Sequence, residues 1–414
     1  MKTISKLLFL IFLSIMSCAI FSAITEKEIQ DNEATYRDNC IQISKKYPTP
    51  EYYRSKNPDG SYFVYDSQPE LSMGMHQIDE ICAEQLNQAG IKFVRLTLYW
   101  DIMVNDPITY TNIWHDYERI FEKYNLIPLV VVHKNPSNFN FENKEEAYKA
   151  FADFMFDMVS EFKSIRYWQL WNEMDVYATD IFGAQKIPLE EIGKNYVKML
   201  KLTYPKIKEA NPDAIVILGP PIHPEFIENV YKAGGKDYFD IVSMHTYDFP
   251  IRWAFIQRGL QARSYMNKYG DANKPLWNTE FGLEAGRYWD TFGKIPDSDP
   301  LGFFDRAQRD QIGECVSINS ILGLYNKIFI YAYIGEPEAR KKEISERVTF
   351  AEGDSIQNYG FSVVREDRSP RPSLVWIIDN QPNKKNKPSR KVKVKIGKIN
   401  KEVTLFTDYP TRVK

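Results

Sequence analysis

The stretch Ile127–His133 reads IPLVVVH and is apolar at almost every position. Such a run is typical of a parallel strand whose sheet is covered by helices on both faces. The next stretch, Lys144–Phe162, carries apolar residues at helical spacing, with Phe151 and Met158 on one face. A buried strand followed by an amphipathic helix predicts an α/β fold.

The same strand-then-helix unit recurs in both directions along the chain. Apolar runs predict strands at residues 71–76, 92–100, 127–133, 166–173, 214–219, 240–245, 275–280 and 327–333. Amphipathic stretches predict helices at residues 78–89, 114–124, 144–162, 190–210, 225–233, 253–269, 305–324 and 372–379. Eight such units are typical of a (β/α)8 TIM barrel, and no glycine-rich turn favours the doubly wound alternative.

The predicted connections have unequal lengths. Those that lead from helix to strand are short, whereas three that lead from strand to helix are long, at residues 174–189, 282–304 and 334–371. In such barrels the functional residues lie at the carboxyl ends of the strands, where elaborated loops accumulate. The sequence therefore predicts a site at this end of a barrel that spans residues 71–381.

Residues 1–19 are predicted to be a secretory signal peptide, with a boundary between residues 18 and 23. Lys2 and Lys6 precede the apolar run Leu7–Met16, and small residues follow. The run is too short for a comfortable transmembrane span, so we expect none in the mature chain. The expected location is outside the cytoplasm, secreted or at the cell envelope, in the periplasm or the extracellular space.

Cys18 introduces an alternative to simple secretion. The residues Ile15–Cys18 resemble the cleavage box of bacterial lipoproteins, in which the cysteine becomes lipid-modified. A lipid anchor at Cys18 would attach the protein to a membrane without spanning it. Cleavage after Ala19 or Ala23 is the other interpretation.

Two further segments flank the predicted barrel. Residues 24–70 contain a turn signal at 57–60 and are expected to form a lead-in that packs against the barrel. In residues 382–414, lysines alternate with valine and isoleucine at 391–396, and a second β-type run follows at 403–406. This predicts a small β-hairpin whose lysines face solvent and keep its edge strand from pairing with other chains.

Composition excludes several classes of function. The chain has 53 basic and 55 acidic residues, a formal net charge of −2, which argues against a nucleic-acid partner. Beyond the signal segment, Cys40, Cys82 and Cys315 have no metal-site spacing. A Cys40–Cys82 disulfide and three buried thiols remain equal alternatives. We expect neither a cofactor nor a metal.

Two glutamates end predicted strands at the functional face. Glu173 closes strand four in the motif Trp-Asn-Glu, and Glu280 closes strand seven in Thr-Glu-Phe-Gly. Retaining glycosidases use two carboxyl groups about 5–5.5 Å apart. Strands four and seven lie on opposite sides of an eight-stranded ring, so both side chains are expected to converge over its axis.

These motifs resemble those of the clan A retaining glycoside hydrolases, with families 39 and 5 the nearest in likeness, over roughly residues 71–380. That clan has an Asn-Glu pair ending strand four and a nucleophilic glutamate ending strand seven. The resemblance implies that Glu173 is the general acid/base and Glu280 the nucleophile. It also implies that Asn172 binds the sugar 2-hydroxyl.

Five other residues extend the resemblance. Arg95 on strand two resembles the arginine that keeps the nucleophile ionised. His245 and Tyr247, after strand six, resemble a His-x-Tyr pair whose tyrosine hydrogen-bonds the nucleophile. His133, at the end of strand three, is similar to a substrate-contacting histidine of family 5. Tyr333 stands where many relatives have a tryptophan that forms the floor of the first sugar subsite.

The chain also departs from the pattern of its relatives. Many of them have proline after the acid/base glutamate, where this chain has Met174 and Asp175. At position 333 tyrosine replaces tryptophan. Because of these two departures, the resemblance does not identify the substrate. We expect an oligo- or polysaccharide with β-linkages: β-glucan, xylan, mannan or a microbial exopolysaccharide. Endo and exo action remain alternatives, as do the possible oligomeric states.

Two other functions are weighed against retaining hydrolysis. His76, His133, His223 and His245 all follow predicted strands, so a metal-dependent barrel hydrolase is one alternative. A carbohydrate-binding barrel without catalysis is the other. The metal alternative is disfavoured because strand one lacks a His-x-His motif and no aspartate ends strand eight. The binding alternative is disfavoured because both glutamates are present.

Overall fold

The computed structural model describes residues 71–74, 78–136, 144–176, 182, 187–247, 251–283, 308–309, 311–313, 315–316, 319, 323–333, 361–364, 370–379, 390–396 and 399–405. The predicted signal segment with Cys18, the lead-in at 24–70 and Cys40 all lie outside these residues, as does most of the predicted helix 305–324. Within the described parts of the chain, no helix is both long and apolar enough to cross a bilayer.

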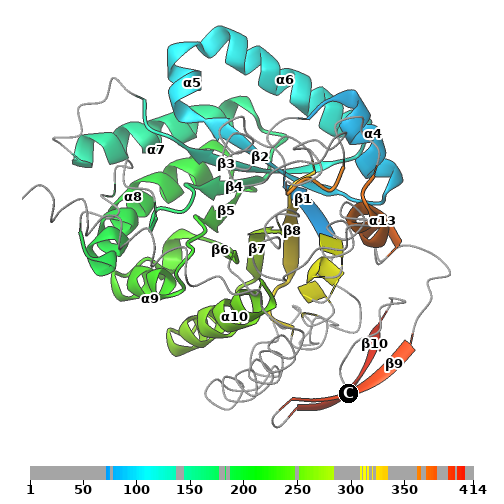
Figure 1. Cartoon of the computed structure of the whole chain (residues 1–414). Coiled ribbons are helices and arrows are strands. Elements are labelled where there is room, and N and C mark those ends of the chain that lie inside the picture. Colours follow the sequence, from blue (N-terminus) through cyan, green and yellow to red (C-terminus); the bar gives the residue numbers. More distant parts are fainter. Residues whose placement is uncertain are drawn as a thin grey trace, which may run out of the picture.

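Parallel strands form a ring in chain order, and helices surround it (Figure 1). The strands are β1 (Leu71–Gly74), β2 (Phe93–Tyr99), β3 (Ile127–His133), β4 (Tyr167–Leu170), β5 (Ile215–Leu218), β6 (Val242–His245), β7 (Leu276–Phe281) and β8 (Lys327–Tyr331). Their pairing order is β5-β4-β3-β2-β1-β8-β7-β6. The β5 and β6 ends of this order approach through a bridge between Ile217 and Ile241. The predicted (β/α)8 barrel is confirmed.

The helices lie outside the ring of strands (Figure 1). They are α4 (Glu80–Gln88), α5 (Trp100–Asn105), α6 (Pro107–Lys123), α7 (Lys144–Glu161), α8 (Leu189–Ala210), α9 (Glu225–Lys232), α10 (Ile251–Lys268) and α13 (Pro372–Asp379), with a 3-10 turn η1 (Lys236–Tyr238). The prediction placed the start of one helix at residue 114, whereas α6 begins at Pro107. Asp106 caps it by accepting from the Thr109 backbone nitrogen, and proline suits the first helical position.

Apolar side chains fill the barrel at its amino-terminal end. A buried cluster of Phe93, Leu129, Trp277 and Phe329 comes from four different strands. The Phe93 ring meets the Trp277 ring edge-on, with the two centroids 5.9 Å apart. A larger apolar core lies between the strands and the helices. Apolar side chains therefore close the barrel interior at the amino-terminal ends of the strands, and polar side chains concentrate toward their carboxyl ends.

The C-terminal hairpin is present as the sequence predicted. Strand β9 (Arg390–Ile396) pairs antiparallel with β10 (Ile399–Leu405), from Ile396 opposite Ile399 to Arg390 opposite Leu405.

The carboxyl ends of β4 and β5 are packed closely around Gly219. The Tyr196 hydroxyl of α8 donates to the Leu170 carbonyl at 2.7 Å and accepts from the Gly219 nitrogen at 2.7 Å. A side chain at Gly219 would collide with the Leu170 carbonyl oxygen and the Met174 methyl group. Only glycine fits between these two strand ends, which carry the residues of the site described below.

We expect Gly219→Ala to lower the free energy of unfolding by roughly 1–3 kcal/mol, because backbone must move to admit the methyl group. Thermal melting monitored by circular dichroism measures this effect. Gly74→Ala is the matched control, since a Cβ there would lie 3.5 Å from the Tyr331 ring, an ordinary contact. Equal melting temperatures for the two variants would contradict the packing described here.

Candidate active site

A layer of buried polar side chains crosses the barrel below its mouth. Arg95 of β2 donates from Nε to Gln169 Oε1 of β4 at 2.8 Å. The Gln169 amide donates to Ser243 Oγ of β6 at 2.8 Å and to Thr279 Oγ1 of β7 at 3.0 Å. Because all four residues are buried and hydrogen-bonded to one another, the orientation of the Arg95 side chain is fixed from below.

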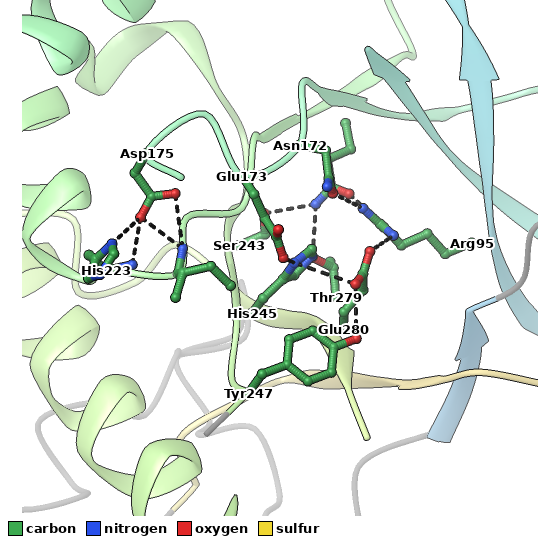
Figure 2. Close-up of polar contacts among 12 residues, drawn as sticks. Arg95, Asn172, Glu173, Asp175, His223, Ser243, His245, Tyr247, Thr279 and Glu280 are labelled. Carbon is green, nitrogen blue, oxygen red and sulfur yellow. Dashed lines mark hydrogen bonds and ion pairs between the residues drawn. The ribbon is translucent and has the colours of Figure 1, made fainter. Parts of the chain in front are cut away.

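Arg95 presents its two terminal nitrogens to the mouth. Nη1 donates to Glu280 Oε1, and Nη2 donates to Asn172 Oδ1 at 2.8 Å (Figure 2). Arg95 is 5% exposed, and the Glu280 side chain is 13% exposed. A guanidinium group held in this way is a fixed positive charge that stabilises negative charge on the Glu280 carboxylate.

Glu280 faces the barrel interior because β7 contains a bulge. The β6 register passes from Asn278 to Glu280, and the β8 register passes from Asn278 to Phe281, so β7 holds one extra residue here. Strict alternation would send Thr279 and Glu280 to opposite faces of the sheet. Both instead form hydrogen bonds inside the barrel, as expected where a bulge redirects a side chain.

Glu173 is positioned by strained backbone after β4. The strand ends at Leu170, so the prediction that it continues to Glu173 is wrong. Trp171 and Glu173 have φ angles of 77° and 46°, in the left-handed region that costs other residues about 1–2 kcal/mol relative to glycine. The Trp171 nitrogen donates to the Val132 carbonyl at 2.9 Å, and the Glu173 nitrogen donates to the Pro220 carbonyl at 3.0 Å. Bonds to strand β3 and to the connection that follows β5 hold this conformation.

The two carboxyl groups converge on one nitrogen of the His245 imidazole ring. His245 Nδ1 lies 2.6 Å from Glu173 Oε1 and 3.6 Å from Glu280 Oε2 (Figure 2). One ligand atom from each of the three residues lies within 4.8 Å of the other two. The convergence of Glu173 and Glu280 across the barrel mouth therefore occurs as the sequence predicted.

His245 is fully buried beneath the two carboxyl groups. Burial lowers its pKa to about 3, an effect that the neighbouring Glu280 charge opposes only in part. The ring is therefore neutral above that pH and carries one proton on either Nδ1 or Nε2. Among the described residues, Nε2 has no hydrogen-bond partner. The contact of the ring with Glu173 is thus its principal polar interaction.

Tyr247 binds the other oxygen of Glu280. Its hydroxyl donates to Glu280 Oε2 at 2.9 Å, and its backbone carbonyl accepts from Arg258 Nη1 at 2.6 Å. Burial first, and then the Glu280 charge, raise the pKa of Tyr247 well above its ordinary value, so the phenol stays a donor. Its ring packs edge-on against Tyr331 and Phe361, with centroids 6.4 and 5.7 Å away.

The remaining predicted residues lie in different places. His133 is half-buried at the end of β3, with its ring 5.6 Å from that of Tyr99. Tyr333 lies beyond the end of β8, is fully buried, and donates through its hydroxyl to Gln85 of α4. Tyr331, the last residue of β8, is instead the tyrosine that packs beside the site. The strand ends two residues earlier than predicted, which explains the difference.

Asp175 and His223 are further polar residues at the site that the candidate set did not contain. Asp175 Oδ2 lies 2.9 Å from His223 Nδ1, on the other side of Glu173 from Arg95 and Glu280 (Figure 2). The sequence offered one signal, because Asp175 lies in the pair of residues that replaces the proline of many relatives. Their contact joins the β4 and β5 connections and could not be read from spacing.

Glu173, His245 and Glu280 also form the set whose ligand atoms gather closely enough to hold a metal ion, among the described residues. The Arg95 guanidinium, however, donates directly to Glu280, so a cation would lie next to a fixed positive charge. His133 and His223 do not belong to this set, and His76 lies outside the described residues. The arrangement fits acid and base chemistry better than metal binding.

Solved structures share this fold at low sequence identity. A family 39 glycoside hydrolase from Bacteroides cellulosilyticus is 18% identical, with a TM-score of 0.54 over 80% of this chain and 67% of that chain. An endo-β-1,4-glucanase variant from Xanthomonas axonopodis pv. citri is 11% identical, with a TM-score of 0.50 over 76% and 100% of the two chains. These likenesses support the barrel fold. Comparison with curated proteins gives no match.

A family model described as cellulase, glycosyl hydrolase family 5, matches residues 63–299, which is more than half of the chain. The match includes Arg95 and both converging carboxyl groups, Glu173 and Glu280. It agrees with the clan A resemblance inferred from the strand-end motifs. The chain therefore belongs to glycosyl hydrolase family 5 and is a glycosidase.

Proposed function

We propose that the protein hydrolyses β-glycosidic bonds of an oligo- or polysaccharide with retention of configuration. The observation that carries this proposal is the closeness of the two carboxyl groups, whose nearest oxygens lie within 4.8 Å of each other. Retaining enzymes hold their carboxyl groups about 5–5.5 Å apart, whereas inverting enzymes need about 6.5–9.5 Å to admit water. The closeness of the Glu173 and Glu280 oxygens supports the retaining arrangement over the inverting one.

In the first step, a Glu280 carboxylate oxygen forms a bond to the anomeric carbon as the bond to the leaving oxygen breaks. Glu173 gives its proton to that leaving oxygen, so the departing sugar leaves as a neutral alcohol. The fixed charge of Arg95 and the Tyr247 hydroxyl hold the two Glu280 oxygens in place. Positioning of the nucleophile is thus complete before substrate binds.

In the second step, a water molecule attacks the anomeric carbon and the bond to Glu280 breaks. The Glu173 carboxylate takes one proton from that water, which restores the starting protonation of both groups. The regenerated carboxylate of Glu280 is again stabilised by Arg95 and Tyr247. The net reaction consumes one water molecule and needs no other reactant.

Asn172 is suited to bind the sugar in this mechanism. Its Oδ1 accepts from Arg95 Nη2 at 2.8 Å, which orients the side-chain amide. The amide nitrogen can then donate to a substrate hydroxyl, and a bond to the 2-hydroxyl strengthens toward the transition state. Asn172 thereby links the substrate to the same guanidinium that holds the nucleophile.

The neutral His245 ring is proposed to contact Glu173 in both of its protonation states without changing tautomer. With its proton on Nδ1, the ring donates to Glu173 Oε1, which accepts as a carboxylate oxygen or, when the acid proton is on Oε2, as the carbonyl oxygen of the carboxyl group. The same 2.6 Å contact is therefore satisfied in both halves of the reaction. A protonated imidazolium would instead favour the carboxylate and withdraw Glu173 from its acid role.

Export is part of the proposal. The N-terminal lysines and apolar run support a signal peptide, and Cys18 supports a lipid anchor as the alternative. A polysaccharide substrate outside the cytoplasm agrees with either. The metal-dependent alternative predicts that a chelator abolishes activity, whereas the two-glutamate mechanism predicts full activity in its presence.

Glu280→Gln should lower kcat on an activated β-glycoside by more than about 10³-fold, because the amide cannot attack the anomeric carbon. The melting temperature should stay within a few degrees of the parent, since the amide oxygen can still accept from Arg95. Initial rates and melting curves measured together test this prediction. Parental turnover by the folded variant would exclude the proposed nucleophile.

Glu173→Ala should slow hydrolysis of the same activated β-glycoside, and added azide should restore its turnover with a β-glycosyl azide as product. Azide needs no general base and fits the space left by the carboxyl group, so it attacks the glycosyl-enzyme from the β face. Rate measurements and NMR of the product give the answer. An α-glycosyl azide would show that configuration is not retained.

The pKa of about 3 for buried His245 predicts an acid-sensitive fold. Histidine in the unfolded chain has a pKa near 6.5, so between about pH 3 and 6.5 only the unfolded chain carries this proton. Stability from this group is therefore present above pH 6.5 and is lost as pH falls. Near pH 5 the slope of unfolding free energy against pH should be about 1.4 kcal/mol per unit smaller in His245→Asn than in the parent.

Denaturant unfolding at a series of pH values measures these slopes. His115→Asn is the control, because a hydrogen bond to Glu118 raises the pKa of His115. Its contribution to stability is fully present below pH 6.5 and is lost only as pH rises above that value, so its removal should leave the slope near pH 5 at the parental value. Equal slopes for the parent and His245→Asn would mean that the buried ring is protonated in the folded protein.

A further inference from the structure

The connection between β5 and α9 is unusually rigid. Its sequence, Gly219–Pro224, reads GPPIHP and contains three prolines, which restrict the backbone and donate no hydrogen bonds. The carbonyls of the first two prolines are used by neighbouring strand ends. Pro220 accepts from the Glu173 nitrogen at 3.0 Å, and Pro221 accepts from the His245 nitrogen at 3.1 Å. This segment is therefore hydrogen-bonded to the backbone of Glu173 and of His245.

The Asp175 carboxylate binds the next two residues of the segment. Its Oδ2 accepts from the Ile222 nitrogen at 3.0 Å and from the His223 nitrogen at 2.7 Å. The same oxygen lies 2.9 Å from His223 Nδ1. The Asp175 side chain is completely buried, so its charge is satisfied by these groups rather than by solvent. One carboxylate thus fixes both the backbone and the ring of His223.

His223 is nevertheless exposed at the barrel mouth. Its side chain is 56% exposed although its Nδ1 is held by a buried acid. Because Nδ1 carries the proton shared with Asp175, Nε2 is the atom left to face solvent, and Asp175 also raises the pKa of the ring. Ordinary exposed histidines sample several rotamers, whereas this one is held in a single orientation. Such restraint is typical of a side chain that binds a ligand.

The position of His223 corresponds to the leaving-group side of the site. Glu173 gives its proton to the leaving oxygen, and His223 lies beyond Glu173 on the side away from Glu280 and Arg95 (Figure 2). The bond from the Glu173 nitrogen to Pro220 ties the two connections together. A sugar attached to the leaving oxygen would therefore extend from Glu173 toward the His223 ring.

We propose that His223 is a binding residue of the subsite for the leaving-group sugar, and that Asp175 is its positioning residue. With its proton on Nδ1, the neutral His223 ring accepts a hydrogen bond at Nε2 from a hydroxyl of that sugar. The proposal rests on the proposed function and adds to it that the natural substrate has a sugar, rather than a small aglycone, on this side. Asp175 belongs to the pair of residues that follows Glu173 where many relatives have proline.

The test compares two substrates that differ only in the leaving group. The parent is first screened on cello-, xylo- and manno-oligosaccharides and on the matching 4-nitrophenyl β-glycosides. For the series that is cleaved, His223→Ala should lower the ratio of kcat/KM for the oligosaccharide to that for the aryl glycoside about tenfold, the value of one hydrogen bond. A general loss of structure would lower both constants together and leave the ratio at the parental value.

His115→Ala is the matched control for this measurement. His115 is also partly exposed, and its Nδ1 lies 3.0 Å from a glutamate, Glu118, but it belongs to α6 on the outside of the barrel. It should leave the ratio at the parental value. An unchanged ratio in His223→Ala would overturn the proposal. Failure of the parent to cleave any glycoside would overturn the proposed function together with this inference.

Asp175→Asn tests the positioning role. The amide can still accept from the backbone nitrogens of residues 222 and 223, but it no longer supplies a charged partner for the His223 ring. We expect the substrate ratio to fall about three- to tenfold, and the double variant with His223→Ala to fall no further than His223→Ala alone. Additive losses would show that Asp175 does not act through His223.

Transglycosylation gives an independent readout. In the second step an acceptor sugar bound in the same subsite competes with water for the glycosyl-enzyme. With an aryl glycoside donor and added disaccharide acceptor, His223→Ala should lower the ratio of transfer product to hydrolysis product several-fold relative to His115→Ala. Equal product ratios in the two variants would contradict binding of the leaving-group sugar by His223.

Discussion

The Arg95 guanidinium is the interaction on which the site depends. It is held from below by Gln169 and reaches upward to Glu280 and Asn172, so one buried side chain connects the barrel interior, the nucleophile and the substrate-binding amide. A buried positive charge must be paired, and here its partners are the groups that act on the sugar. The polar layer with Ser243 completes the hydrogen-bonding of Gln169 and leaves little freedom for movement.

Two local departures from regular backbone geometry bring the carboxyl groups of Glu173 and Glu280 to the barrel mouth above Arg95. The bulge in β7 turns Glu280 inward, and the left-handed backbone at Glu173 does the same after β4. Hydrogen bonds to neighbouring parts of the barrel hold each departure, as between the Glu173 nitrogen and the Pro220 carbonyl of the connection after β5. Strain of this kind persists where the surrounding structure determines it, and it commonly marks functional sites.

A second buried acceptor, Asp175, orients a side chain at the mouth of the barrel. Asp175 orients the His223 ring, just as Gln169 is a buried acceptor that orients the Arg95 guanidinium. In the proposed mechanism Arg95 holds the nucleophile and His223 binds the leaving-group sugar. The proline-rich connection provides rigidity without a helix or strand, because its backbone has few conformations to lose.

The sequence by itself determined the barrel and the main chemical groups, because strand periodicity and position at a strand end are local properties. The run Ile127–His133 predicted the strand and helix units of the barrel correctly, and the motifs around Glu173 and Glu280 predicted that these two side chains converge at its mouth, whereas their catalytic roles stay predictions. Only tertiary structure decided which tyrosine lies beside the site, since Tyr331 replaces Tyr333 once β8 ends early. It also decided the pairing of Asp175 with His223, because the contact joins segments 48 residues apart and depends on how neighbouring strand ends pack.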